Sequence, residues 1–147
     1  MSVFHPDTYT YAPVTPFTEG SDGKVYIFAY THGALTAKTP YVIYTNEYGN
    51  VTAALSDVAI YTYVAVPNDT FASGVLAKLQ IGGYCADMIT PSLTSVVGYA
   101  LRIYDGAAAL VSADFTGAAG QFAALCDATT ATTHNVMLCG HIILTVT

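Results

Sequence analysis

Short runs of β-branched and aromatic residues, each ended by turn-forming residues, recur along the whole 147-residue chain. In 59–66 the side chains alternate, which would place Thr62 on one face of a strand and Tyr63 on the other. Many short strand segments separated by turn signals roughly every 8–12 residues are typical of all-β sandwiches and barrels. We therefore predict an all-β fold, with a compact sandwich or barrel-like body of 8–10 short strands and little helix. The strands that the pattern predicts are 24–31, 41–45, 51–55, 59–66, 76–82, 100–104, 107–112, 121–127, 135–138 and 142–146.

Turn chemistry indicates how some of these strands are joined. Residues 46–50 include Gly49, which can adopt a positive φ, and predict a hairpin between the second and third strands. Asp105 and Gly106 form the clearest hairpin turn in the chain. The consecutive glycines at 82–83 predict a bulge or a close backbone approach.

The remaining connections are less regular. We expect 90–95 to be a short connection or a single helical turn, and the threonine-rich segment 128–133 to be a loop. Segments 70–76 and 112–119 are the two candidates for a short helix, although the glycines around the second favour a loop.

Residues 1–23 differ from the body, which we assign to 24–147. Their prolines, Pro6, Pro13 and Pro16, prevent continuous pairing in a sheet. One interpretation is a frayed terminus; the other is an extended N-terminal arm that lies on a partner. The arm interpretation is favoured by four large apolar side chains that a solvated tail would not need, which we take as partner-binding anchors: Phe4, Tyr9, Tyr11 and Phe17.

Charged residues make up only 10% of the chain, against roughly 25% in ordinary soluble domains. The net charge is −6, and the four basic residues are scattered, which disfavours binding to nucleic acid or to a membrane surface. Apolar runs are too short for a spanning helix, and the N-terminus does not have the pattern of a secretory signal. So little charge on a compact body predicts that copies of the chain, or a larger partner, cover much of its surface.

Three cysteines, Cys85, Cys126 and Cys139, are widely spaced and include no C-x-x-C pair. We expect buried free thiols in or beside strands, with one disulfide and a spare thiol as the alternative. His134 and His141 flank Cys139 and would be the first candidates for a zinc site. A fourth ligand is not obvious, although Asp127 or His32 could serve, and ordinary polar histidines beside a buried cysteine are the favoured interpretation.

Other chemistry is weakly indicated. Cys85 or Cys126 could pair with a histidine, His32 or His134, as a nucleophile, but neither cysteine has a basic neighbourhood. Most acidic residues stand beside turn formers, and the chain has no phosphate-binding glycine motif. The 12 tyrosines and 6 phenylalanines could form a sugar-binding platform, although the chain has no tryptophan. We expect no enzymatic activity, no catalytic residues and no cofactor or metal.

Four segments are similar to one known family. They are 18–30 (TEGSDGKVYIFAY), 79–89 (LQIGGYCADMI), 97–106 (VGYALRIYDG) and 136–144 (VMLCGHIIL). In this pattern the chain, from about Tyr9 to Thr147, resembles the capsid decoration (cement) proteins of tailed bacteriophages. The resemblance implies a β-rich body with an arm, placed as a homotrimer at three-fold and quasi-three-fold positions of a capsid, with no catalytic residues.

The function predicted on this basis is that of a virion structural protein on the capsid exterior, made in the host cytoplasm. Its partner would be the major capsid protein, and it would stabilise neighbouring capsid subunits by burying apolar surface and by strand addition from the arm. The alternative is a tail or surface adhesion module that binds a glycan. A small hydrolase is a distant third hypothesis.

Overall fold

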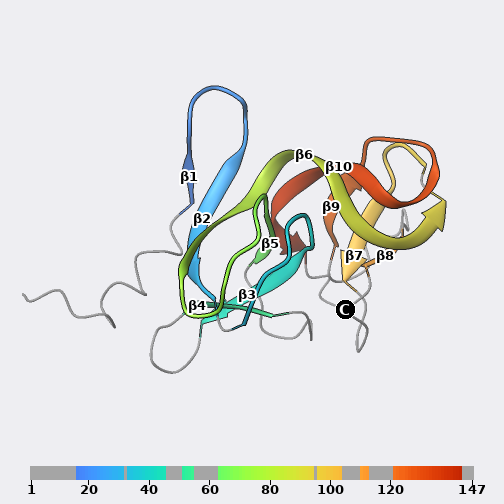
Figure 1. The fold of residues 1–147 in the computed structure, drawn as a ribbon. Coiled ribbons are helices and arrows are strands. Elements are labelled where there is room, and N and C mark those ends of the chain that lie inside the picture. Colours follow the sequence, from blue (N-terminus) through green and yellow to red (C-terminus); the bar gives the residue numbers. More distant parts are fainter. Residues whose placement is uncertain are drawn as a thin grey trace, which may run out of the picture.

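A computed structural model describes residues 16–31, 33–45, 51–54, 63–94, 96–103, 110–112 and 121–143 of the chain. All regular secondary structure in these residues is β, which confirms the predicted all-β body (Figure 1). The same residues contain no helix long and apolar enough to cross a membrane. The strands are β1 Phe17–Thr18, β2 Val25–Tyr30, β3 Tyr41–Thr45, β4 Val51–Ala54, β5 Tyr63–Pro67, β6 Leu76–Thr94, β7 Ala100–Ile103, β8 Leu110–Ser112, β9 Gln121–Leu125 and β10 Thr130–Ile143.

Strand β6 organises the fold. Its first part pairs with β2 and β5, and its second part pairs with β10. The order through the sheet is β4-β3-β5-β6-β10-β9-β7-β8, with β2 and β1 joined to β6 as a branch, and every strand pair is antiparallel. Figure 1 shows β6 arching over the molecule, from β2 at one side to the region of β7 and β8 at the other.

Two hydrophobic cores lie along this strand, and β5 and β6 serve both. In β5, Val64 and Val66 point into one core while Ala65, between them, points into the other. Both faces of β5 are therefore buried. The N-terminal core consists of Ile27, Ala29, Leu35, Tyr41, Ile43, Ala65, Ala77, Leu79 and Ile81. The C-terminal core consists of Val64, Val66, Cys85, Met88, Leu101, Phe122, Ala123, Leu125, Val136 and Leu138.

A β-bulge interrupts β6 within the C-terminal core. Between the pairs His134↔Met88 and Val136↔Cys85, β6 has one more residue than β10. Asp87 takes up this excess with a positive φ of 55°, and its N–H donates to Oδ1 of Asn135 at 3.1 Å. The extra residue shifts the alternation, which is why Met88 reaches the core from an even position.

Two segments differ from the sequence-based prediction. Residues 90–94 are not a connection but the end of β6, and 130–133 are not a loop but the start of β10. The pairing there is irregular, since β6 has four steps between Ile89 and Leu93 where β10 has two. Such an irregularity tolerates Pro91, which has no N–H for a regular ladder. The strands are therefore longer than predicted, with β6 spanning 19 residues and β10 spanning 14.

Other local predictions have mixed outcomes. β3 pairs with β4, and β7 with β8, as both predicted hairpins require, although residues 46–50 and 104–109 lie outside the described part. Residues 70–76 do not form a helix; Phe71 makes an isolated bridge to Leu35 instead. The other helix candidate, from 113 onward, and the first four residues of the predicted strand 59–66 are outside the described residues.

Lys38 ties the connection after β2 to both shared strands. Its N–H donates to the Pro67 carbonyl at 2.7 Å, and its carbonyl accepts from the Ile89 N–H at 2.9 Å. Its Nζ donates to Oδ1 of Asn68 at 2.8 Å. Lys38 adopts a positive φ of 64° here, so these bonds hold the backbone in a conformation that a lysine seldom takes.

The β1–β2 hairpin projects beyond the rest of the sheet (Figure 1). Opposite the end of its turn, Gly83 of β6 has a φ of +85°, and a Cβ added there would lie 2.6 Å from the Gly23 carbonyl oxygen. The predicted close backbone approach at 82–83 is therefore confirmed. It brings the turn before β2 directly onto β6.

Candidate docking surface

The side of β2 that faces away from the N-terminal core carries aromatic residues. Ile27 and Ala29 point into the core, so the alternation turns Tyr26 and Phe28 outward. The pairing of β2 with β6 sets Phe28 opposite Lys78. We call the resulting surface the aromatic face; it is made of Phe17, Tyr26, Phe28, Leu76 and Lys78.

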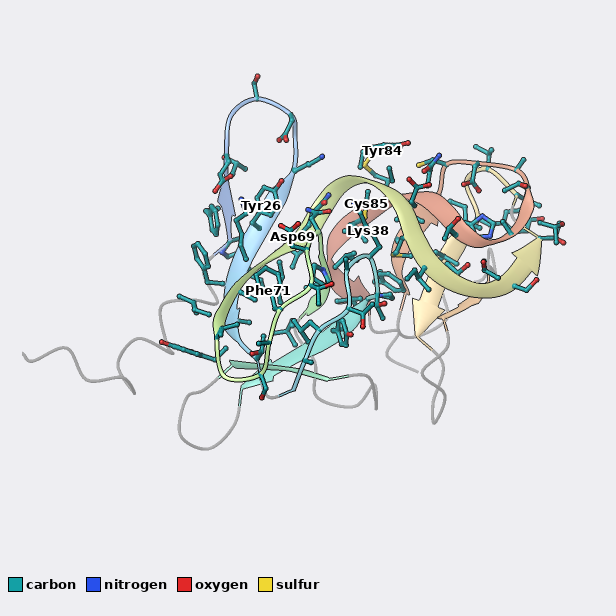
Figure 2. All side chains as sticks on the ribbon, in the orientation of Figure 1. Tyr26, Lys38, Asp69, Phe71, Tyr84 and Cys85 are labelled. Carbon is teal, nitrogen blue, oxygen red and sulfur yellow. The ribbon has the colours of Figure 1, made fainter. Side chains whose placement is uncertain are left out.

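Phe17 of β1 covers one end of this face. Its ring stacks on Phe28 with centroids 5.0 Å apart and planes 17° apart, and it lies 5.9 Å from the Tyr26 ring. Tyr26 is buried under this contact, whereas Phe28 remains 37% exposed and Leu76 42% exposed. Figure 2 shows Tyr26 among the side chains that crowd the side of the β1–β2 hairpin. Apolar area in this position is costly to leave in water.

The one described cation on the aromatic face is already paired. Nζ of Lys78 lies 2.9 Å from a carboxylate oxygen of Glu19 and 4.8 Å from the centre of the Tyr26 ring. The hydrogen bond to Glu19 raises the pKa of the Lys78 ammonium, and the attraction of that carboxylate acts in the same direction. The pair cancels in charge and suits an uncharged partner.

Of the four predicted anchors, the structure describes Phe17 alone; Phe4, Tyr9 and Tyr11 lie outside the described residues. Phe17 does act as an aromatic anchor, but on β2 of its own chain. Tyr26 and Phe28, on which it rests, were missed as site residues. The alternation in 25–30 would have found them, had one side of the strand been polar enough to mark the outer face.

A second exposed surface crosses three strands on the C-terminal half. The register aligns Tyr84 of β6, Met137 of β10 and Ala124 of β9 in one row. Tyr84 is 42% exposed and Met137 45% exposed, and Cys139, two residues further along β10, is exposed as well. Figure 2 shows Tyr84 pointing away from the body above β6. We call this row, with Cys139, the uncharged face.

His134 is a structural residue of the C-terminal half. Its ring is buried; Nδ1 lies 2.8 Å from Oδ1 of Asp127, and Nε2 lies 3.2 Å from the Ala131 carbonyl oxygen. The other oxygen of Asp127 accepts the N–H of Asn135 at 2.6 Å. These bonds fasten the chain after β9 to β10.

The described residues contain no cluster of ligands that would support the zinc hypothesis. His134 points inward while Cys139, five residues further along the strand, is exposed. Within the described part of the chain, no three His, Cys, Asp or Glu residues are close enough to hold a metal ion. The side chains of His32 and His141 lie outside that part.

The three cysteines are free, but only Cys85 is buried as expected; Cys126 and Cys139 are exposed. Cys85 lies within β6, Cys126 directly follows β9, and Cys139 lies within β10, in or beside strands as predicted. Burial raises the pKa of the thiol in all three, which opposes the thiolate that a nucleophile requires. His134 is engaged by Asp127 and Ala131, so the Cys126–His134 pair lacks a base directed at sulfur.

Comparisons with family models and with curated proteins yield no relative. No family model matches the chain, and no curated protein matches its sequence. The site is therefore interpreted from its own geometry.

Proposed function

We propose that this protein is a virion structural protein, a capsid decoration protein that binds the outer capsid surface and stabilises neighbouring capsid subunits. The observation that carries the proposal is the stack of Phe17 on Phe28, at the point where the N-terminal segment joins the body. It provides one example of an aromatic residue of this segment anchoring on an aromatic residue of the sheet. The proposal extends the same mode of binding to Phe4, Tyr9 and Tyr11.

The surface chemistry supports an assembly role over a catalytic one. The aromatic face and the uncharged face both expose large apolar side chains, on the two halves of the body. Their only described cation is the Lys78 that Glu19 neutralises. Contacts through such surfaces are driven by apolar burial, at roughly 1.5–3 kcal/mol for each large side chain removed from water. The partners would be the major capsid protein and adjacent copies of the chain, in a homotrimer on the virion exterior.

The test is reconstitution on empty capsids that lack this protein, prepared from the virus that encodes it. Full-length protein should bind to saturation. Removal of residues 2–15 should lower capsid affinity by at least about tenfold, since it removes three anchors. This deletion retains Phe17, because Phe17 packs on its own β2 and its loss would disturb the body.

A matched pair of variants makes the test specific. Tyr9→Ala/Tyr11→Ala should reproduce most of the loss, whereas Thr8→Ala/Thr10→Ala, which changes as many residues in the same segment, should bind as the full-length protein does. No binding of full-length protein to capsids would overturn the proposal. Selective binding to one glycan on an array, without capsid binding, would replace it with the adhesion function.

A further inference from the structure

The aromatic face is only partly covered by its own chain. Phe17 seals the end near Tyr26, but Phe28 and Leu76 beyond it remain about 40% exposed. Val75, next to Leu76, is also exposed. The uncovered part of the face consists of the exposed portions of Phe28 and Leu76. This apolar surface can receive one or two further aromatic rings.

The N-terminal segment carries two residues suited to this position. In an extended chain, residues two apart share a side, so Tyr9 and Tyr11 fall on the same side as Phe17. Residues 1–16 contain a single charged side chain, Asp7. This segment therefore matches the uncovered part of the aromatic face in chemistry: aromatic, nearly uncharged and able to stack.

The same chain is poorly placed to fill its own face. β1 begins at Phe17, and the residue before it is Pro16, which has no N–H to extend the ladder along β2. Pro16 thus opposes extension of β1 along β2.

We infer that the aromatic face receives the N-terminal arm of a second copy of this chain, with Tyr9 and Tyr11 of that copy packing on Phe28 and Leu76. The inference rests on one part of the proposed function, namely that the arm binds a partner. Every copy has one arm and one aromatic face, so head-to-tail exchange would satisfy all of them when it closes into a ring. The eight residues 9–16, when extended, span up to about 26–29 Å, which is enough to reach from one small domain onto the next.

The experiment is analytical ultracentrifugation of the full-length chain and two kinds of variant. The arm variant is Tyr9→Ala/Tyr11→Ala, and the face variant is Phe28→Ala/Leu76→Ala. Each should weaken self-association by at least about tenfold. The control is Ile89→Ala, which shortens an apolar side chain of similar exposure, 41%, outside both faces and should leave self-association unchanged.

Mixing the two variants gives the decisive readout. In the mixture, the face variant supplies a functional arm and the arm variant supplies a functional face. An equimolar mixture should therefore form a 1:1 heterodimer and no larger species. Circular dichroism of each variant establishes that the body is folded before it is mixed.

Three results would overturn the inference. They are a full-length chain that stays monomeric at all concentrations, an equal effect of Ile89→Ala, and variants that associate no better when mixed than alone. Capsid binding is measured separately. A full-length chain that binds capsids but does not self-associate would reject arm exchange alone, whereas self-association through the arm without capsid binding would reject the decoration function alone.

Discussion

The two cores of this protein share β5 and β6 but differ in the regularity of the sheet above them. Over the N-terminal core, β2 and β6 pair residue for residue from Tyr26↔Gln80 to Tyr30↔Leu76. Over the C-terminal core, β6 and β10 are interrupted twice, at Asp87 and again between Ile89 and Leu93. In a regular strand pair the side chains keep alternating between the two faces, so aromatic residues line up on one outer face. In an interrupted pair the residues after the bulge change faces and the strand bends.

Polar groups are also distributed differently between the two halves. Charged side chains of the N-terminal half lie on its surface, as in the pair Lys78–Glu19. The C-terminal half instead buries His134 and holds it with Asp127, while its exposed row from Tyr84 to Ala124 has no charge. Both halves therefore bury hydrogen-bonded polar side chains, but those of the first half, Thr31 and Gln80, are neutral, whereas the second half buries the ionisable ring of His134.

The largest expected effect tests whether the two cores are one cooperative unit. Leu79→Ala in the N-terminal core and Leu125→Ala in the C-terminal core should each lower the free energy of unfolding by about 2–5 kcal/mol, because both side chains are fully buried. Since β5 and β6 contribute to both cores, each variant should unfold in one transition in urea, with coincident fluorescence and circular dichroism curves. Two separate transitions would show that the halves are independent.

The next effect concerns the point where the hairpin meets β6. Gly83 and Gly98 have nearly the same φ, +85° and +87°, but only at Gly83 would an added Cβ meet neighbouring atoms. Gly98→Ala should cost roughly 1–2 kcal/mol from backbone conformation alone. Gly83→Ala should cost about 1–3 kcal/mol more, because its Cβ would overlap the Gly23 carbonyl. Equal losses in thermal unfolding of the two variants would mean that the hairpin does not pack on β6 in solution.

Buried hydrogen bonding in the C-terminal half is tested by Asp127→Ala. The change leaves Nδ1 of the buried His134 ring without its carboxylate partner, and should lower the free energy of unfolding by about 1–3 kcal/mol. Asp69→Ala, an exposed acid of the other half, should change it by less than about 0.5 kcal/mol. Chemical denaturation of both variants at one pH makes the measurement, and similar losses would contradict the structural role of Asp127.

Within the C-terminal half, Cys85 faces the core and Cys139 is exposed, so substitutions at these cysteines compare the two sides of the sheet in their contribution to stability. Cys85→Ser places a hydroxyl in the core and should cost roughly 1–3 kcal/mol. Cys139→Ser changes an exposed side chain and should lie within about 0.5 kcal/mol of the unchanged protein. If Cys139→Ser proved the more destabilising of the two, β10 would have to face the other way.

The smallest effect is on the surface of the N-terminal half. Glu19→Gln should lower the pKa of Lys78 toward its ordinary value of 10.5, because the hydrogen bond to the Glu19 carboxylate is the main cause that raises this pKa. A raised folded-state pKa means that the ion pair contributes fully below pH 10.5 and is lost as the pH rises above it. NMR titration of Lys78 measures the shift. Asp22→Asn, in the same turn, should leave the Lys78 pKa as it is.

Sequence patterns predicted the class of fold and most strand positions, since alternation in segments such as 24–31 reflects burial of one side of a strand. They predicted the hairpin pairing of β3 with β4 from the Gly49 turn, and the close approach at Gly83 from consecutive glycines. They did not predict that β6 continues through Gly82–Gly83 and Pro91. Glycine and proline normally end strands, and only bulges and long-range pairing with β10 keep these residues within one.

The functional surface divides in the same way. The sequence is enough to identify Phe17 as a large apolar residue close to the proline-rich segment, and to show that the chain has too little charge to cover its own surface. The contacts of Phe17 with Phe28, and of Lys78 with Glu19, 59 residues away, are visible only in the folded chain. The reason is physical: which side of a strand faces out depends on the strands and the core that cover its other side, and those partners come from distant parts of the chain.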